Sequence, residues 1–173
     1  PVNYVLPPGE TRILDPGQPQ LRQENEQALS FTITDLESGQ RRAIYKNSYN
    51  DLRRYKRIQM YTHAESVVGK TPLKKGDLSV FMRLGTDYKN NYYEYEIPLT
   101  ITPEGQYSGN NYNDQLAVWP QDNMFDFALE ILKNLKQERN KEKRKAGSAI
   151  TFTTPYTGYY PERPSNRITV MGN

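Results

Sequence analysis

The chain has 173 residues, a length that suits one domain with a hydrophobic core of its own. It contains no cysteine, which excludes disulfides, thiolate metal sites and thiol catalysis, and its formal charge of +3 matters only where it is concentrated. No apolar run approaches the roughly 20 residues that a membrane-spanning helix needs, so we expect the fragment itself to be soluble. Because it begins with Pro1 rather than Met, we expect an excerpt of a longer protein.

The first elements in chain order are an arm and two strands. Five prolines and no hydrophobic periodicity predict a proline-rich extended arm over residues 1–27. The remaining residues 28–173 are predicted to form a single domain, and the apolar alternation near the end indicates that it continues past Asn173. Alternating apolar residues predict a strand over 29–34, and a second strand is expected over 41–46 after the turn 35–40.

Three longer strands are predicted next, over 57–64, 78–84 and 92–99. Their alternation places Met82 and Leu84 on the core face of one strand, and Tyr93 and Tyr95 on the core face of the next. The opposite face of the last strand then carries Tyr92, Glu94 and Glu96. Residues 102–118 are rich in Gly and Asn, which predicts a long loop.

The hydrophobic period then changes to that of a helix. Apolar residues from Met124 to Leu135 lie on one helical stripe, and Asn123 is placed to cap it, so we predict a single amphipathic helix over 123–145. Two more strands are expected over 150–154 and 167–171. The predicted fold is mainly β, an antiparallel β-sandwich of jelly-roll or galactose-binding-like type with one α-helix.

Catalytic residues are hard to assemble from this sequence. Glu94 and Glu96 share a strand face, as the acid and nucleophile of a glycosidase could, but carboxylates on a solvated strand face are far commoner and Arg83 is a natural cross-strand partner. His63, the only histidine, is better explained as a strand-face residue packed beside Tyr61 or Gln59. No nucleophile-elbow, phosphate-loop or dinucleotide motif occurs. We therefore expect no enzymatic activity and no cofactor.

A Ca²⁺ ion and a nucleic acid are two further ligands that parts of the sequence could bind. Asn and Asp residues over 87–91 and 110–114 could hold one Ca²⁺, but neither stretch has the acidic spacing of a hand-type calcium loop, and turn chemistry explains the same residues. Basic residues concentrate over 133–145, without the aromatic residues that nucleic-acid surfaces interleave with them. We expect a solvated helix end there, no metal site and no nucleic acid.

Tyrosines are the most promising binding residues. Strand parity leaves Tyr92 free, and Tyr88 and Tyr112 lie in polar loops, so these three form the predicted interaction surface. Rings of this kind dock a protein or stack on sugar rings. A carbohydrate-binding β-sandwich module is therefore the alternative to a protein-interaction domain.

Several segments also resemble a known family. The opening NYVLPPGE, the stretch RRYKRIQMYTHAE over 53–65, DLSVFMRLGTDYKNNYYEYEIPL over 77–99, VWP over 118–120 and the closing NRITVMGN are similar to one region of the SprA/Sov proteins. These are very large outer-membrane proteins of Bacteroidetes that are linked to gliding motility and protein secretion. The segments span most of the chain.

This resemblance implies a soluble insertion from a giant barrel that forms the type IX secretion translocon. It implies a non-enzymatic domain at the outer membrane or cell surface, whose side of the membrane the sequence leaves open. The implied partners are other segments of the same barrel protein, a shuttle protein and a plug protein that gate the pore, and secreted cargo. No functional residue is carried over from the family to this region, and the oligomeric state stays open.

Overall fold

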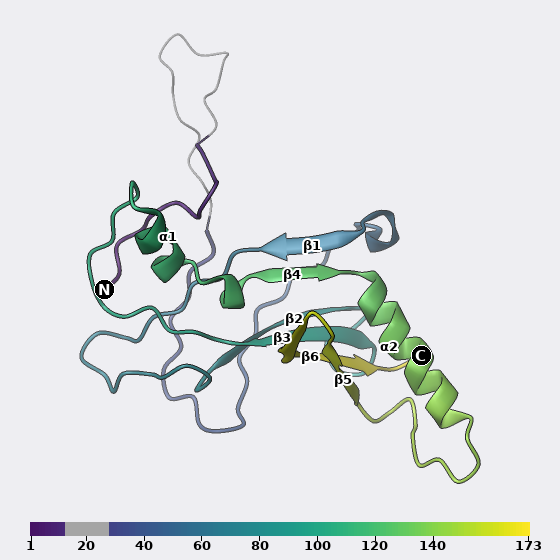
Figure 1. Ribbon diagram of the computed structural model, residues 1–173. Coiled ribbons are helices and arrows are strands. Elements are labelled where there is room, and N and C mark those ends of the chain that lie inside the picture. The colour runs from purple at the N-terminus through teal and green to yellow at the C-terminus, as the bar shows by residue number, and fades with distance from the viewer. Residues whose placement is uncertain (13–27) are drawn as a thin grey trace.

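The computed structural model describes residues 1–12 and 28–173 (Figure 1). These residues form six β-strands in two antiparallel sheets, two α-helices and two short 3-10 helices. The mainly β, antiparallel architecture predicted from the sequence is confirmed.

The larger sheet has four strands in the order β2-β3-β6-β5: β2 (Ser79–Gly85), β3 (Tyr92–Pro98), β6 (Arg163–Met171) and β5 (Tyr156–Tyr160). Met82 lies opposite Tyr95, which lies opposite Ile168, so these side chains share one face of the sheet. That face is the inner one, because all three belong to or pack against the hydrophobic core. The predicted parity of β2 and β3 is therefore correct.

The smaller sheet pairs β1 (Arg57–Met60) with β4 (Phe125–Ala128) and covers part of that inner face (Figure 1). The rings of Phe127 and Tyr95 stack with 4.1 Å between their centroids, and Phe125 lies 6.0 Å from the same tyrosine ring. Both phenylalanines are fully buried. Two sheets thus face each other across an aromatic core, as in a β-sandwich.

The helix α2 (Glu130–Lys143) covers another part of the inner face, over β5 and β6. Leu132 and Leu135 are its buried apolar residues. Leu135 lies so close to β5 that a Cβ atom on Gly158 would stand 2.7 Å from the leucine Cδ1, so a larger residue at this strand position would displace the end of the leucine side chain.

The predicted helix over 123–145 is wrong at its start. Residues 125–128 form β4 instead, because Phe125 and Phe127 alternate and both bury their rings when the segment pairs with β1. Asn123 does not cap the helix; its buried amide bonds the backbone of Thr100, accepting from the N–H and donating to the C=O, each at 2.8 Å. The strand pairing thus shortens the helix.

The stretch over 102–118, predicted as a loop, contains a helix that lies beside the N-terminal arm. Residues Tyr112–Val118 form α1, which the Asn111 side chain caps by accepting from Asn113 N. The arm packs on this region, because Trp119 Nε1 donates to Val5 O at 2.8 Å and Asn3 is bonded to the backbone of Tyr107. Of the arm predicted over 1–27, residues 13–27 lie outside the described residues.

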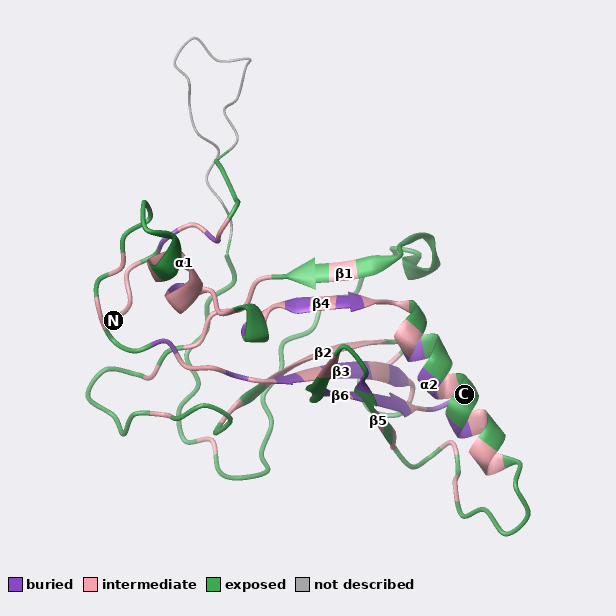
Figure 2. Ribbon diagram, viewed as in Figure 1, coloured by how far each residue is buried: buried purple, intermediate pink, exposed green. Residues whose placement is uncertain are grey.

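The strands predicted over 29–34 and 41–46 are wrong. Residues 28–56, named here the exposed segment, contain one 3-10 turn at Leu52–Arg54 and no strand, and almost all of their side chains are exposed (Figure 2). Phe31, which the predicted strand would half-bury, is 56% exposed. Extended backbone becomes a strand only when another strand pairs with it, and none does here among the described residues.

Three smaller predictions also change. The strand expected over 57–64 ends at Met60. The strand expected over 150–154 is absent, and β5 begins at Tyr156, because the Thr151 hydroxyl accepts from Thr153 N and turns the backbone. The last strand begins at Arg163, ahead of the predicted position 167.

Candidate interaction surface

The outer face of the larger sheet carries a network of ion pairs. Glu94 on β3 is 3% exposed, although it lies on the face turned away from the core. Its carboxylate accepts from Arg83 Nε on β2 at 3.0 Å and from Arg41 Nη1 at 2.9 and 3.0 Å. The predicted Arg83–Glu94 pair is therefore confirmed, and the second arginine comes from the exposed segment.

Glu96 continues this network two residues along β3. It accepts from the Ser79 hydroxyl at 2.6 Å and from Arg41 Nη2 at 3.1 Å, and it pairs with Arg167 on β6. Burial by itself would raise the pKa of Glu96, but the hydrogen bonds from Ser79 and Arg167 and the charges of Arg167 and Arg41 together lower it below its usual value. A carboxyl held in its charged form suits an ion pair and not a general acid.

Tyr92 belongs to the same outer face and is buried. Its side chain is 8% exposed because the Arg83 guanidinium lies over its ring, 3.8 Å from the centroid. Arg41 and Arg83 also flank the ring of Phe81, at 5.1 and 5.4 Å. The prediction that Tyr92 is free for binding is wrong, because strand parity places it away from the core but does not reveal the arginines that cover it.

The other two predicted surface tyrosines are exposed. Tyr88 is stacked on Tyr45 of the exposed segment, with 5.4 Å between ring centroids, and Tyr112 lies on α1. No ring contact joins them to one another within residues 1–12 and 28–173. Their role as contact residues stays a prediction.

His63 has a structural environment. Its ring lies 5.8 Å from that of Trp119, and its Nδ1 atom is 2.8 Å from Val118 O, after the end of β1 rather than on a strand face. These contacts tie the end of β1 to the end of α1. The histidine thus packs as a structural residue, with different neighbours from those expected.

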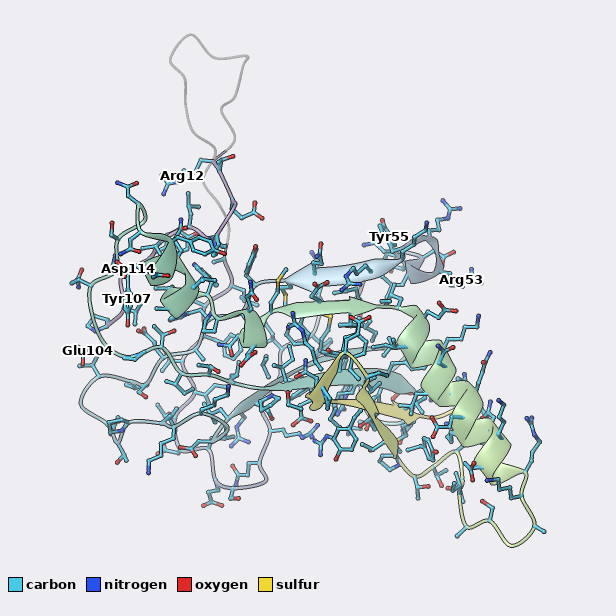
Figure 3. All side chains as sticks on the ribbon, in the orientation of Figure 1. Arg12, Arg53, Tyr55, Glu104, Tyr107 and Asp114 are labelled. Atoms are coloured by element: carbon cyan, nitrogen blue, oxygen red, sulfur yellow. The ribbon has the colours of Figure 1, made fainter. Side chains whose placement is uncertain are left out.

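The Asn- and Asp-rich loops use their oxygens for turns. Asp87 Oδ1 accepts from the backbone N–H groups of Asn90, Lys89 and Asn91, and these bonds hold the Asp87 pKa well below its usual range. In the other stretch, Asp114 lies in the first turn of α1 and accepts from Ser108 N in the preceding loop, and Figure 3 shows it close to Tyr107. No group of three or more acidic or histidine side chains in the described ranges is arranged to hold a metal ion.

The basic run over 133–145 contains one buried member. Arg139 is fully buried, donates from Nη1 to Gly172 O at 2.6 Å, and lies 4.8 Å from the ring centroid of Phe152. Lys143 lies 4.3 Å from the same centroid. The end of α2 is therefore anchored to Gly172, just after β6. The expectation of a solvated helix end is wrong for Arg139, whereas Lys141, Arg144 and Lys145 are exposed.

Among residues 1–12 and 28–173, the largest collection of exposed apolar side chains lies on the exposed segment. It joins eight aliphatic and aromatic residues: Leu29, Phe31, Ile33, Ile44, Tyr45, Tyr49, Leu52 and Tyr55. Figure 3 shows the last of these beside Arg53, at the turn before β1. Between residues 31–34 and 42–44 lies a groove of about 330 Å³, named here the apolar groove for Phe31, Ile33, Ala43 and Ile44, which line it together with Thr32, Thr34 and Arg42. The alternation over 29–33 identifies some of these apolar residues from the sequence, but it predicts that they lie on a strand.

Arg41 is the residue of this surface that sequence reasoning missed. It ties the exposed segment to the sheet through Glu94 and Glu96, which lie more than fifty positions away in the chain. Its neighbour Arg42 has the same chemistry and makes no such pair, so residue type carries no signal that separates the two.

Among the described residues, no helix is both long and apolar enough to cross a bilayer.

Comparison with known proteins identifies one family. The family model SprA_N, described as "Motility related/secretion protein", matches residues 1–173, which is the whole chain. The match confirms the resemblance carried by the sequence segments. A search of curated proteins gives no match.

Proposed function

The chain belongs to the SprA_N family of motility-related and secretion proteins, and from this premise we propose that it is a non-catalytic structural and interaction domain of an outer-membrane secretion translocon. The translocon is that of the type IX secretion system, which also supports gliding motility. The partners are other segments of the same large barrel protein, the shuttle and plug proteins that gate the pore, and secreted cargo.

The exposed segment is the observation that carries this proposal. Its eight exposed apolar residues stand close together in the chain, whereas scattered single apolar residues are normal on a protein surface. Four of the eight are aromatic, and aromatic residues are enriched where proteins meet one another. Such a surface is expected to be covered in the assembled machine.

The ion pairs on the outer sheet face support binding rather than catalysis. Arg41 fixes the exposed segment to two carboxylates of β3, and Tyr45 stacks on Tyr88 in the loop that joins β2 to β3. Because the segment is already held in place, it loses less conformational entropy when a partner binds. Glu94 and Glu96 thus serve to position a docking surface.

The test introduces substitutions into the chromosomal gene of the cell that naturally makes the protein. Ile44→Asp with Tyr49→Asp puts charges on the exposed segment, and we expect secretion of a reporter protein and surface motility to fall severalfold. Val68→Asp, an exposed apolar site outside the segment, is the matched control. Unchanged secretion in the double variant, at an unchanged level of the protein, would contradict the proposal.

Glycan binding is tested separately. Titration of the purified chain with common surface glycans is expected to give no saturable heat, because Tyr92 is buried and Tyr88 is stacked on Tyr45. Saturable heat that disappears in a variant with Tyr88→Ala and Tyr112→Ala would favour the carbohydrate-binding alternative.

A further inference from the structure

The apolar groove lies between two stretches that form no regular secondary structure. Residues 31–34 form one wall and residues 42–44 the other, and the turn 35–40 connects them. Within that turn Gln40 N donates to Glu37 O at 3.0 Å. Across residues 1–12 and 28–173, no backbone N–H or C=O group of either wall takes part in a backbone hydrogen bond.

The walls have the composition of strands. Phe31, Thr32, Ile33 and Thr34 are all aromatic or β-branched, which are the residue types that favour extended, paired backbone. Unpaired extended backbone beside such side chains is the feature that proteins use when they bind a peptide by adding a strand. Here two unpaired walls stand on opposite sides of one groove, and the backbone groups of both are free of backbone hydrogen bonds in the described residues.

Charge restricts the occupant further. Among the described residues, Arg42 is the only charged one that lines the groove. Its guanidinium donates to Arg41 O and to Gln40 Oε1, both at 3.1 Å, and to no carboxylate in the described part of the chain. A carboxylate on the occupant would complete a charge-assisted pair with it.

We propose that the apolar groove binds an extended segment of a second polypeptide, which inserts as a strand between the two walls. The segment has apolar side chains at alternate positions and an acidic residue facing Arg42. Four wall residues span about 13 Å at about 3.3 Å per residue, so a short linear stretch fills the site. This inference rests on the proposed function and gives its partner a chemistry.

The first test uses a displayed library of random nine-residue peptides, selected against the 173-residue chain. We expect the enriched peptides to alternate apolar residues and to contain Asp or Glu. Phe31→Ala with Ile44→Ala is expected to weaken their binding at least tenfold, whereas Val68→Ala leaves it unchanged. No enrichment, or enriched peptides that bind the groove variant equally well, would overturn the proposal.

The second test examines backbone pairing with N-methylated versions of one selected peptide. Successive residues of a strand point their N–H groups to opposite sides. Insertion between two walls therefore predicts that methylation at each of two successive central residues weakens binding by about 2- to 10-fold. Weakening at only one of the two would show pairing with a single wall and overturn the insertion.

The third test exchanges charges. Arg42→Glu is expected to weaken binding of the acidic peptide and to strengthen binding of the same peptide with Lys in place of its acidic residue. Lys46→Glu, outside the groove lining, is expected to change neither affinity. Failure of this exchange would overturn the assigned pairing. Self-association of the chain that blocks the selected peptides would assign the groove to a second copy and overturn the proposal as well.

These outcomes separate the strand inference from the proposed function. If secretion falls in the variant with Ile44→Asp and Tyr49→Asp but no peptide is enriched, the interaction function stands and strand insertion is overturned. If secretion is unchanged, the proposed function fails, whatever the peptides do.

Discussion

Residues 29–34 and residues 78–84 have the same alternation of apolar and polar side chains, and only the second stretch contains a strand. β2 has β3 beside it, so its backbone groups are paired and Met82 and Leu84 pack against the core. The earlier stretch has no neighbour of this kind among the described residues, and its apolar side chains stay exposed. Alternation thus reports a capacity to pair, and the partner decides whether a strand forms.

The two regions also differ in how they are attached. The sheets adhere through a buried aromatic and aliphatic core, whereas the exposed segment is held to the outer face through Arg41 and a ring contact of Tyr45. Core burial dominates the free energy of unfolding, and partly exposed ion pairs contribute little. The segment can therefore change without unfolding the sheets.

The largest expected difference lies between two phenylalanines. Phe127→Ala removes a fully buried ring that stacks on Tyr95, and we expect the free energy of unfolding to fall by about 3–5 kcal/mol. Phe31→Ala should change it by no more than about 0.5 kcal/mol, because that ring is largely exposed. Urea denaturation of both variants measures the contrast, and similar losses would show that Phe31 is packed.

Neighbouring residues of β2 offer a finer comparison. Met82 faces the core, so Met82→Ala is expected to cost about 2–3 kcal/mol of unfolding free energy. Phe81 lies on the outer face between two arginines, and Phe81→Ala should cost about 1 kcal/mol through lost cation–π contacts. A larger loss for Phe81→Ala in denaturant melts would reverse the two faces.

Arg41 and Arg42 test the attachment of the exposed segment. Arg41→Ala removes the pairs with Glu94 and Glu96, and we expect a loss of about 1 kcal/mol together with severalfold faster chymotrypsin cleavage after Tyr45. Arg42→Ala is the matched control, since that side chain has no carboxylate partner in the described residues. Equal cleavage rates in the two variants would exclude Arg41 as the anchor.

The smallest effect concerns acid stability of the loop between β2 and β3. Backbone N–H groups, that of Asn90 first, lower the pKa of Asp87 in the folded chain, while an unfolded aspartate titrates near pH 3.8. The Asp87 contribution is therefore complete above about pH 4 and is lost as the pH falls toward the lower folded pKa. In Asp87→Ala, Tm should fall less between pH 5 and pH 2 than in the unchanged chain. An identical fall in Tm for the two chains would show that the Asp87 carboxylate does not stabilise the loop.

Local pattern was informative where the pairing partner is close in the chain. The alternation of β2 and β3 predicted their faces and the Arg83–Glu94 pair, because a short loop joins the two strands and sets their register. The pattern over 124–135 led to a wrong helix start, because residues at helical spacing overlap there with the strand alternation of Phe125 and Phe127. Pairing with β1, which lies far back in the chain, decided between the two, and no local signal carries that information.

Some features of the binding surface were also predictable from local sequence, and others were not. The family, the antiparallel β architecture and the unusual density of tyrosines could be read from the sequence, since each depends on residue identity or on spacing within one segment. The burial of Tyr92, the anchoring by Arg41 and the exposure of Phe31 were decided only by the tertiary structure. Each depends on which distant residue lies opposite, and a side chain is buried or free only relative to a neighbour that folding brings to it.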